Sequence, residues 1–149
     1  MSHFITLVIV PGDTPMNRIE QKVATLLEPY SEYNPRNTHV KWDWWVIGGR
    51  WDGWIFGPEQ EKASRDKDHG MNLDDKHRTL KNNCRPVSEI PPNALHYIPF
   101  AILTPDGEWT DWDEISATNE KAPKAWHETV KAVLEKYLKH LAVAVDCHT

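Results

Sequence analysis

The sequence predicts an α+β protein in which a mainly antiparallel sheet carries two helices on one face. Three observations lead to this class. Apolar strands lie near both ends of the chain, an amphipathic helix follows the first strand and another precedes the last, and short strands with turn signals lie between them. The expected order is β-α-β(β)-loop-β-β-α-β, which makes a ferredoxin-like sandwich the first expectation.

The first strand is expected over residues 4–10, where apolar and β-branched side chains follow one another almost without interruption. PGDTPMN then begins a helix, with Thr14 as its N-cap and Pro15 at its first position. Apolar residues recur at helical spacing, so one stripe of this helix is expected to face the sheet. They are Ile19, Val23, Leu26, Leu27 and Tyr30.

The next segment, KWDWWVIGGRWDGW over residues 41–54, contains five tryptophans and is expected to form a long strand or hairpin. Gly48 and Gly49 mark a bulge or turn within it. Residues 58–89 are charged and lack sustained periodicity, which indicates a long surface insertion with a short helix.

After the insertion, ALHYIPFAILTP predicts another buried strand, and EWTDW pairs back with it as a hairpin through a DG turn. A second amphipathic helix is expected from about Pro123, and LAVAVDCH forms the final strand. The 149 residues fit a single domain, 1–149, that is long enough to bury a core.

The net charge of −5 argues against binding of bulk nucleic acid, which requires a basic face to displace counterions. The negative net charge is compatible with binding of a small anionic ligand by a single arginine. MSHFITLVIV lacks the features of a signal peptide, and no stretch reaches the length of a membrane span. We therefore expect a cytoplasmic protein with no membrane partner, in which Cys84 and Cys147 are reduced thiols.

The tryptophan segment has two interpretations. Arg50 between indoles offers a planar fork for phosphate, while the rings offer a stacking surface for a base. Alternatively, the tryptophans pack beneath the helices, and Arg50 pairs with Asp43 or Asp52. Strand alternation predicts one face with Trp42, Trp44 and Val46 and another with Asp43, Trp45 and Ile47.

The C-terminal VDCH is a second candidate site. On a strand, Asp146 and His148 share one face and Cys147 takes the other, so Asp146 could orient His148 for acid–base work. The alternative is a solvated histidine at a frayed terminus. Glu108 is either a carboxylate partner in a cleft or an exposed hairpin residue. His3 is expected to face solvent. No metal or cofactor motif is present in the sequence.

These segments together resemble a family of small proteins found in tailed bacteriophages and some bacteria, which carry W-D-W/Y-x-x-G-G-R-W, TPDGEWH and a terminal V-D-C-H. The order of the segments matches along most of the chain. Downstream of Trp109 this chain reads TDWDEISATNE, so the histidine and glycine-rich turn of the family are absent. The matching residues are Asp43, Gly48, Gly49, Arg50, Trp51, Asp106, Gly107, Glu108, Trp109, Asp146, Cys147 and His148.

The resemblance implies that Arg50, Asp146 and His148 belong to one site. The expected function is action of a phage anti-defence protein on a small nucleotide, such as a cyclic-nucleotide or ADP-ribose-type immune signal. Hydrolysis would use His148 and Asp146, with Glu108 as a further candidate. The pocket would be formed by Trp44, Trp51, Asp43, Gly48, Gly49 and Arg50.

Two other functions fit the same sequence. The pocket could sequester the nucleotide without reaction, which usually requires enclosure in a homo-oligomer. In the second alternative function, the Trp-rich surface is a protein–protein interaction module that inhibits a host protein, since aromatic residues and arginine anchor such interfaces.

Overall fold

The computed structural model describes residues 2–36, 39–67, 79–118 and 120–149. Six strands form one mixed sheet with the order β2-β6-β1-β4-β5, and β3 pairs with β6 beside β2. The strands are β1 (His3–Val10), β2 (Trp44–Ile47), β3 (Cys84–Pro86), β4 (Ala101–Leu103), β5 (Trp109–Asp111) and β6 (Leu141–His148). The α-helices are α1 (Met16–Leu27), α2 (Pro58–Lys67), α3 (Trp112–Ser116) and α4 (Ala122–Lys136). The predicted α+β class is confirmed.

The two long strands β1 and β6 form the centre of the sheet. They are antiparallel, and their pairing runs from His3 opposite His148 to Val10 opposite Leu141. β1 also pairs with β4 in parallel, while the described pairings of β6 with β2 and β3 and of β4 with β5 are antiparallel. Both central strands are almost entirely buried, which agrees with their continuous apolar sequences.

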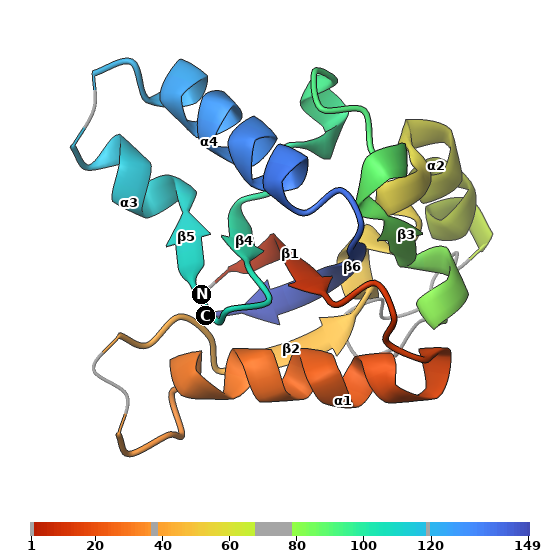
Figure 1. Ribbon diagram of the computed structural model, residues 1–149, viewed down its shortest axis with the longest axis horizontal. Helices are drawn as coiled ribbons and strands as arrows, with labels where there is room; N and C mark the ends of the chain where they lie inside the picture. The colour runs from red at the N-terminus through yellow and green to blue at the C-terminus, as the bar shows by residue number, and fades with distance from the viewer. Residues whose placement is uncertain (1, 37–38, 68–78, 119) are drawn as a thin grey trace.

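The helices α1 and α4 lie on opposite faces of the sheet (Figure 1), so the prediction of two helices on one face is wrong. One core cluster joins the apolar stripe of α1 to Val8 and Val10, while the other joins α4 to Leu7 and Ile9. Alternate residues of β1 thus enter different cores. The protein has three layers, α–β–α, instead of the two layers of a ferredoxin-like sandwich.

Several element boundaries differ from the sequence prediction. The first helix begins at Met16 with Pro15 as its N-cap residue, and the Thr14 hydroxyl donates to the carbonyl of Pro11 instead of capping the helix. The tryptophan segment contains only the short strand β2, followed by 3₁₀ turns. The short helix α3, which the sequence analysis did not predict, begins at Trp112 and is capped by the Asp111 side chain.

The predicted surface insertion is partly wrong. Its first part forms α2, and residues 68–78 lie outside the described residues. Its last part enters the core, because β3 pairs with β6, and both Asn83 and Val87 are buried. Among the described helices, none combines the length and the hydrophobicity needed to cross a membrane.

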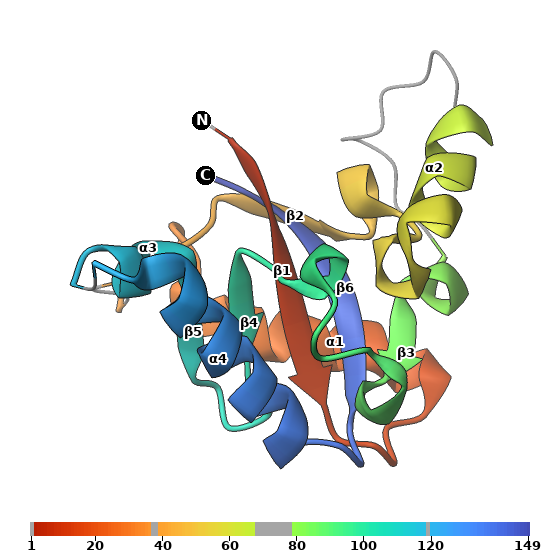
Figure 2. The same cartoon turned by 90° about the horizontal axis from the view of Figure 1, so that it is seen from above.

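The two ends of the described chain lie side by side at one end of the sheet (Figure 2), where the backbones of Ser2 and Thr149 are hydrogen-bonded to each other. The turn between β4 and β5 lies at the opposite end, beyond the Leu103–Trp109 pair. The register of β1 and β6 therefore brings the first and last residues of the sheet together at the candidate site.

Candidate functional site

Two histidines from the two ends of the chain lie in contact. His3 opens β1 and His148 closes β6, and the antiparallel register places them directly opposite each other. Their ring centroids are 5.0 Å apart in an edge-to-face arrangement. The side chains are 11% and 21% exposed, so both rings are largely buried, with part of their surface open to solvent.

Each ring is held by its own aspartate. His3 Nδ1 lies 2.8 Å from Oδ1 of Asp146, and His148 Nδ1 lies 2.7 Å from Oδ1 of Asp43. Asp146 does lie on the same side of β6 as His148, and Cys147 is buried in the core on the opposite face, as predicted. However, the expected Asp146–His148 pair is wrong: the partner of Asp146 is His3, and the partner of His148 is Asp43.

These contacts define which nitrogen of each ring can exchange protons. An ionised carboxylate only accepts hydrogen bonds, so each Nδ1 carries a hydrogen and donates it to the aspartate. Nε2 is then the nitrogen that can take or give a proton at a substrate. The carboxylate also stabilises the imidazolium that forms when Nε2 is protonated. The structure thus combines two oriented acid–base groups in one place.

The Gly48-Gly49 turn positions Asp146. The backbone N–H of Arg50 donates to Oδ2 of Asp146 at 2.9 Å, so the second oxygen of this fully buried carboxylate is also satisfied. Gly49 has φ +51°, and a Cβ added to it would lie 2.3 Å from the same Oδ2. The glycine therefore lets the backbone wrap around the carboxylate. Arg50 is an exposed residue, and its backbone N–H brings it next to Asp146.

Of the five tryptophans, Trp44 is closest to the site. Its ring centroid is 5.6 Å from that of His3. Trp42 and Trp54 are buried, one in each core cluster, while Trp45 and Trp51 are partly buried against those clusters. The expectation that Trp42 shares a face with Trp44 is wrong, because Trp42 and Trp45 both pack on the α1 side. Most of the indole surface thus serves the core.

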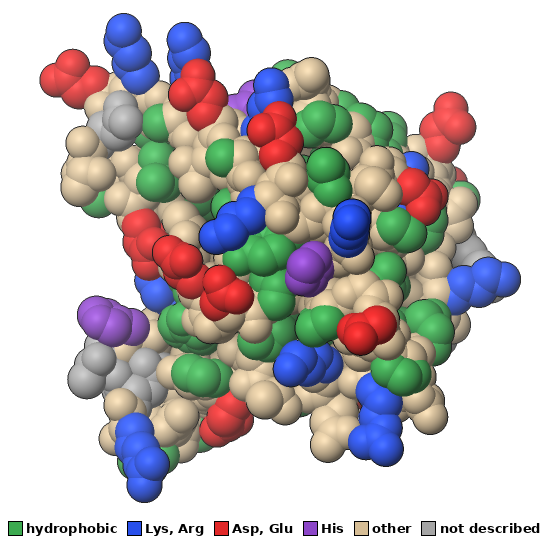
Figure 3. Space-filling view, in the orientation of Figure 1, with side chains coloured by type: hydrophobic (Ala, Val, Ile, Leu, Met, Phe, Trp, Pro, Cys, Tyr) green, Lys and Arg blue, Asp and Glu red, His purple; other side chains and the backbone are tan. Residues whose placement is uncertain are grey.

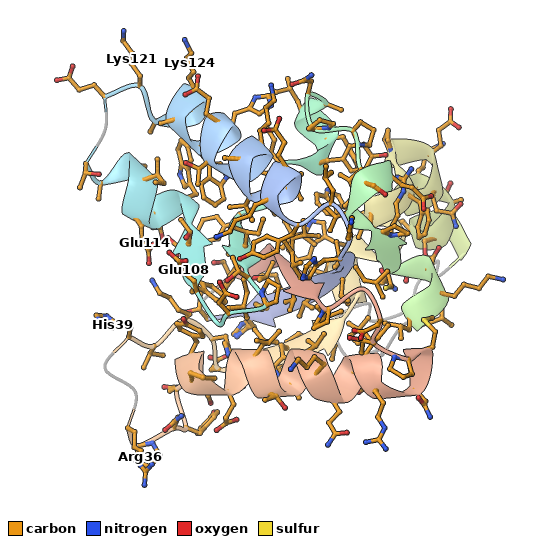
Figure 4. The ribbon with its side chains drawn as sticks, viewed as in Figure 1. Arg36, His39, Glu108, Glu114, Lys121 and Lys124 are labelled. Atoms are coloured by element: carbon orange, nitrogen blue, oxygen red, sulfur yellow. The ribbon has the colours of Figure 1, made fainter. Side chains whose placement is uncertain are left out.

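The remaining predicted residues have other surroundings. The Asp43 carboxylate binds His148, and that of Asp52 accepts from Nδ2 of Asn83 at 2.7 Å and from the Ser64 hydroxyl. Glu108 is exposed on the turn between β4 and β5 (Figure 4), at the end of the sheet opposite His3 and His148. Of the two alternatives for Glu108, the structure agrees with the exposed hairpin residue, and the register separates it from the histidines.

Neither cysteine is a candidate nucleophile. Burial raises the pKa of the Cys147 thiol to about 12 and that of Cys84 to about 11, so both stay protonated at neutral pH. Within the described part of the chain, no group of three or more His, Cys, Asp or Glu side chains is arranged to hold a metal ion.

Charged side chains of both signs are interspersed on the face shown in Figure 3, with no continuous basic surface among its described residues. This arrangement agrees with the overall net charge of −5.

Comparisons with protein-family models, with curated proteins and with solved structures found no match for this chain.

His3 is the residue that the sequence analysis missed. It was expected to face solvent, yet it lies between Asp146, His148 and Trp44. A signal was available, because antiparallel pairing of the first and last strands places a residue near the start of one beside a residue near the end of the other. The pairing itself, however, could not be known before the sheet order.

Proposed function

We propose that this protein hydrolyses a phosphate ester of a small nucleotide, with His3 and His148 as a general acid–base pair. The observation that carries the proposal is that two neighbouring histidines are each held at Nδ1 by a separate aspartate. Hydrolysis of a phosphodiester needs one group that accepts a proton and another that donates one, and this site supplies both.

The proton transfers would be divided between the two rings. One histidine, neutral at Nε2, takes a proton from a water molecule as its oxygen attacks phosphorus. The other, protonated at Nε2, gives its proton to the oxygen that leaves as the phosphorus–oxygen bond breaks. Asp146 and Asp43 keep the two rings oriented throughout and stabilise whichever ring is positively charged.

Binding of the nucleotide would use the neighbouring residues. Arg50 contacts Asp146 through its backbone N–H. We assign its guanidinium to the phosphate, for which a planar bidentate cation is suited. Trp44 lies against His3 and offers a face for stacking. Trp51 packs against the α4-side core and is less suited to that role.

Hydrolysis is favoured over sequestration by the two aspartates. A site that only enclosed a phosphate would need positive charge, whereas paired histidine–aspartate contacts add negative charge and fix the tautomers of the rings. The resemblance to phage proteins points to a nucleotide signal of host defence as the substrate. Free Cys84 and Cys147 suit the cytoplasm, where such a signal would act.

The proposal is tested by incubating the purified protein with cyclic dinucleotides, cyclic oligonucleotides and ADP-ribose derivatives. The mixtures are chromatographed before and after heat denaturation of the protein. We expect new products that appear over time with the wild type and are absent with His148→Gln. A nucleotide that disappears and returns intact on heating would instead establish sequestration. No change in any nucleotide would favour the protein-interaction alternative.

A further inference from the structure

Asn83 is a completely buried asparagine that has no part in the proposed proton transfers. It follows the 3₁₀ turn Leu80–Asn82 and directly precedes β3. A primary amide carries two N–H donors and an oxygen acceptor, so its burial is costly unless these groups find partners. The partners of the Asn83 side chain therefore show which segments of the chain it holds together.

The Asn83 amide binds the turn that follows β2. Its Nδ2 donates to Oδ1 of Asp52 at 2.7 Å and to the Thr79 carbonyl at 2.8 Å, so both hydrogens are used. Its Oδ1 accepts from the backbone N–H of Gly53 at 3.2 Å. The other oxygen of Asp52 accepts from the Ser64 hydroxyl on α2. Two of the three hydrogen bonds of the Asn83 side chain thus hold neighbouring residues of the turn.

The backbone of Asn83 is attached to the central strand β6. Its carbonyl accepts from the N–H of Ala144 at 2.8 Å. Asp146, two residues further along the same strand, accepts from the N–H of Arg50 at 2.9 Å. The turn is therefore fixed to β6 at two places, directly at Arg50 and through Asn83 at Gly53. Both views show β3 and α2 near the end of β2 from which the turn leaves (Figures 1 and 2).

The turn depends on these attachments because it is rich in glycine. Gly48, Gly49 and Gly53 all have positive φ, at 76°, 51° and 83°. Glycine has access to many backbone conformations, so such a turn has little conformational preference of its own. Hydrogen bonds from outside the turn must therefore select the conformation that points the Arg50 N–H at Asp146.

We propose that Asn83 is a positioning residue for the histidine site. By holding residues 52–53, it keeps the Arg50 N–H on Oδ2 of Asp146. The other oxygen of that carboxylate binds Nδ1 of His3, so the position of the turn is transmitted to the ring. The inference rests on the proposed function, in which His3 is one of the two acid–base groups.

The first measurement is hydrogen–deuterium exchange followed by nuclear magnetic resonance, which needs no substrate. In Asn83→Ala, the Arg50 N–H should exchange about 10- to 100-fold faster than in the wild type, because the turn loses buried hydrogen bonds and opens more often. The N–H of Phe100, which donates to the Ile5 carbonyl at 3.1 Å, reports on the rest of the sheet. Its exchange should change far less.

The second measurement is the ¹⁵N spectrum of the histidine rings in the same samples. The ring signals of His3 should shift in Asn83→Ala, because its aspartate loses the contact with the turn. His148 is held by Asp43, which precedes β2, so its ring signals should shift far less. A general loss of stability would not distinguish the two histidines in this way.

Three further variants control for the burial of Asn83. Asn82→Ala removes the adjacent asparagine, whose Oδ1 accepts from Nε2 of Gln60 at 2.9 Å, and should behave like the wild type. Asp52→Ala removes the half-buried partner of Asn83 and should also speed exchange at Arg50, even where Asn83→Ala does not fold. Asp52→Asn keeps an oxygen that can accept from Asn83 Nδ2 and should restore the slow exchange.

The outcomes separate this inference from the function on which it rests. Faster exchange at Arg50 together with a shift confined mainly to His3 supports the role of Asn83, even where no nucleotide is hydrolysed. Wild-type exchange at Arg50 in Asp52→Ala and in any folded Asn83→Ala would overturn it, as would equal acceleration at Phe100. Nucleotide hydrolysis that needs both histidines would then still support the acid–base pair.

Discussion

Replacing His3 with glutamine is expected to lower the rate of nucleotide hydrolysis by about 100- to 10,000-fold, the usual contribution of a general acid or base. Glutamine can still hydrogen-bond to Asp146 but cannot exchange a proton at the substrate. His148→Gln should cause a loss of similar size. Because the two rings act in one step, the double variant should lose much less than the product of the single losses. Steady-state assays on the nucleotide identified by chromatography measure these effects.

His127→Gln is the control for this experiment, because His127 is a half-buried residue on α4 with Nε2 3.3 Å from the Pro92 carbonyl oxygen, away from the paired chain ends. Its activity should equal that of the wild type. An active His3→Gln variant alongside an inactive His148→Gln variant would contradict the pair, and would leave His148 as a histidine that works alone.

Gly49→Ala is expected to lower the free energy of unfolding by about 2–5 kcal/mol. Of this, about 1–2 kcal/mol comes from an L-residue held at positive φ, and about 1–3 kcal/mol from overpacking against Asp146. The added Cβ would also lie 2.6 Å from the Asp146 Cβ, so Asp146 must shift and its 2.8 Å contact with His3 is disturbed. Hydrolysis should therefore fall together with stability. Urea denaturation followed by tryptophan fluorescence measures the change.

Gly107→Ala separates backbone strain from crowding. Gly107 also has positive φ, at +85°, but nothing lies within 4 Å of an added Cβ. We expect a loss of only about 1–2 kcal/mol, with no effect on hydrolysis. Equal losses in the two variants would show that contact with Asp146 is unimportant at Gly49.

Much of the fold could be predicted from local sequence patterns. The continuous apolar runs of β1 and β6 and the helical stripes of α1 and α4 identified the central strands and both main helices. The side of the sheet on which each helix packs could not be read in this way. Both faces of β1 are apolar, so its sequence allows a helix on either side, and the choice depends on the chain connections.

The candidate site could be predicted only in part. Strand alternation correctly placed Asp146 and Cys147 on opposite faces of β6. Strand alternation did not identify the hydrogen-bond partners of Asp146 and His148, because contacts between separate strands depend on register. Asp43 and His3 are far from His148 in sequence, and only the pairing of β6 with both β1 and β2 brings them to it. The pairing of β4 with β1 and β5 likewise places Glu108 at the other end of the sheet from the histidines.

Nuclear magnetic resonance of the ¹⁵N-labelled histidine rings tests the crossed pairing most directly, because it requires no substrate. In the wild type, both His3 and His148 should show the tautomer with hydrogen on Nδ1. Asp43→Asn should change the ring signals of His148 far more than those of His3, and Asp146→Asn should do the reverse. Asp146→Asn acting mainly on His148 would contradict two separately held histidines, and with them the proposed acid–base pair.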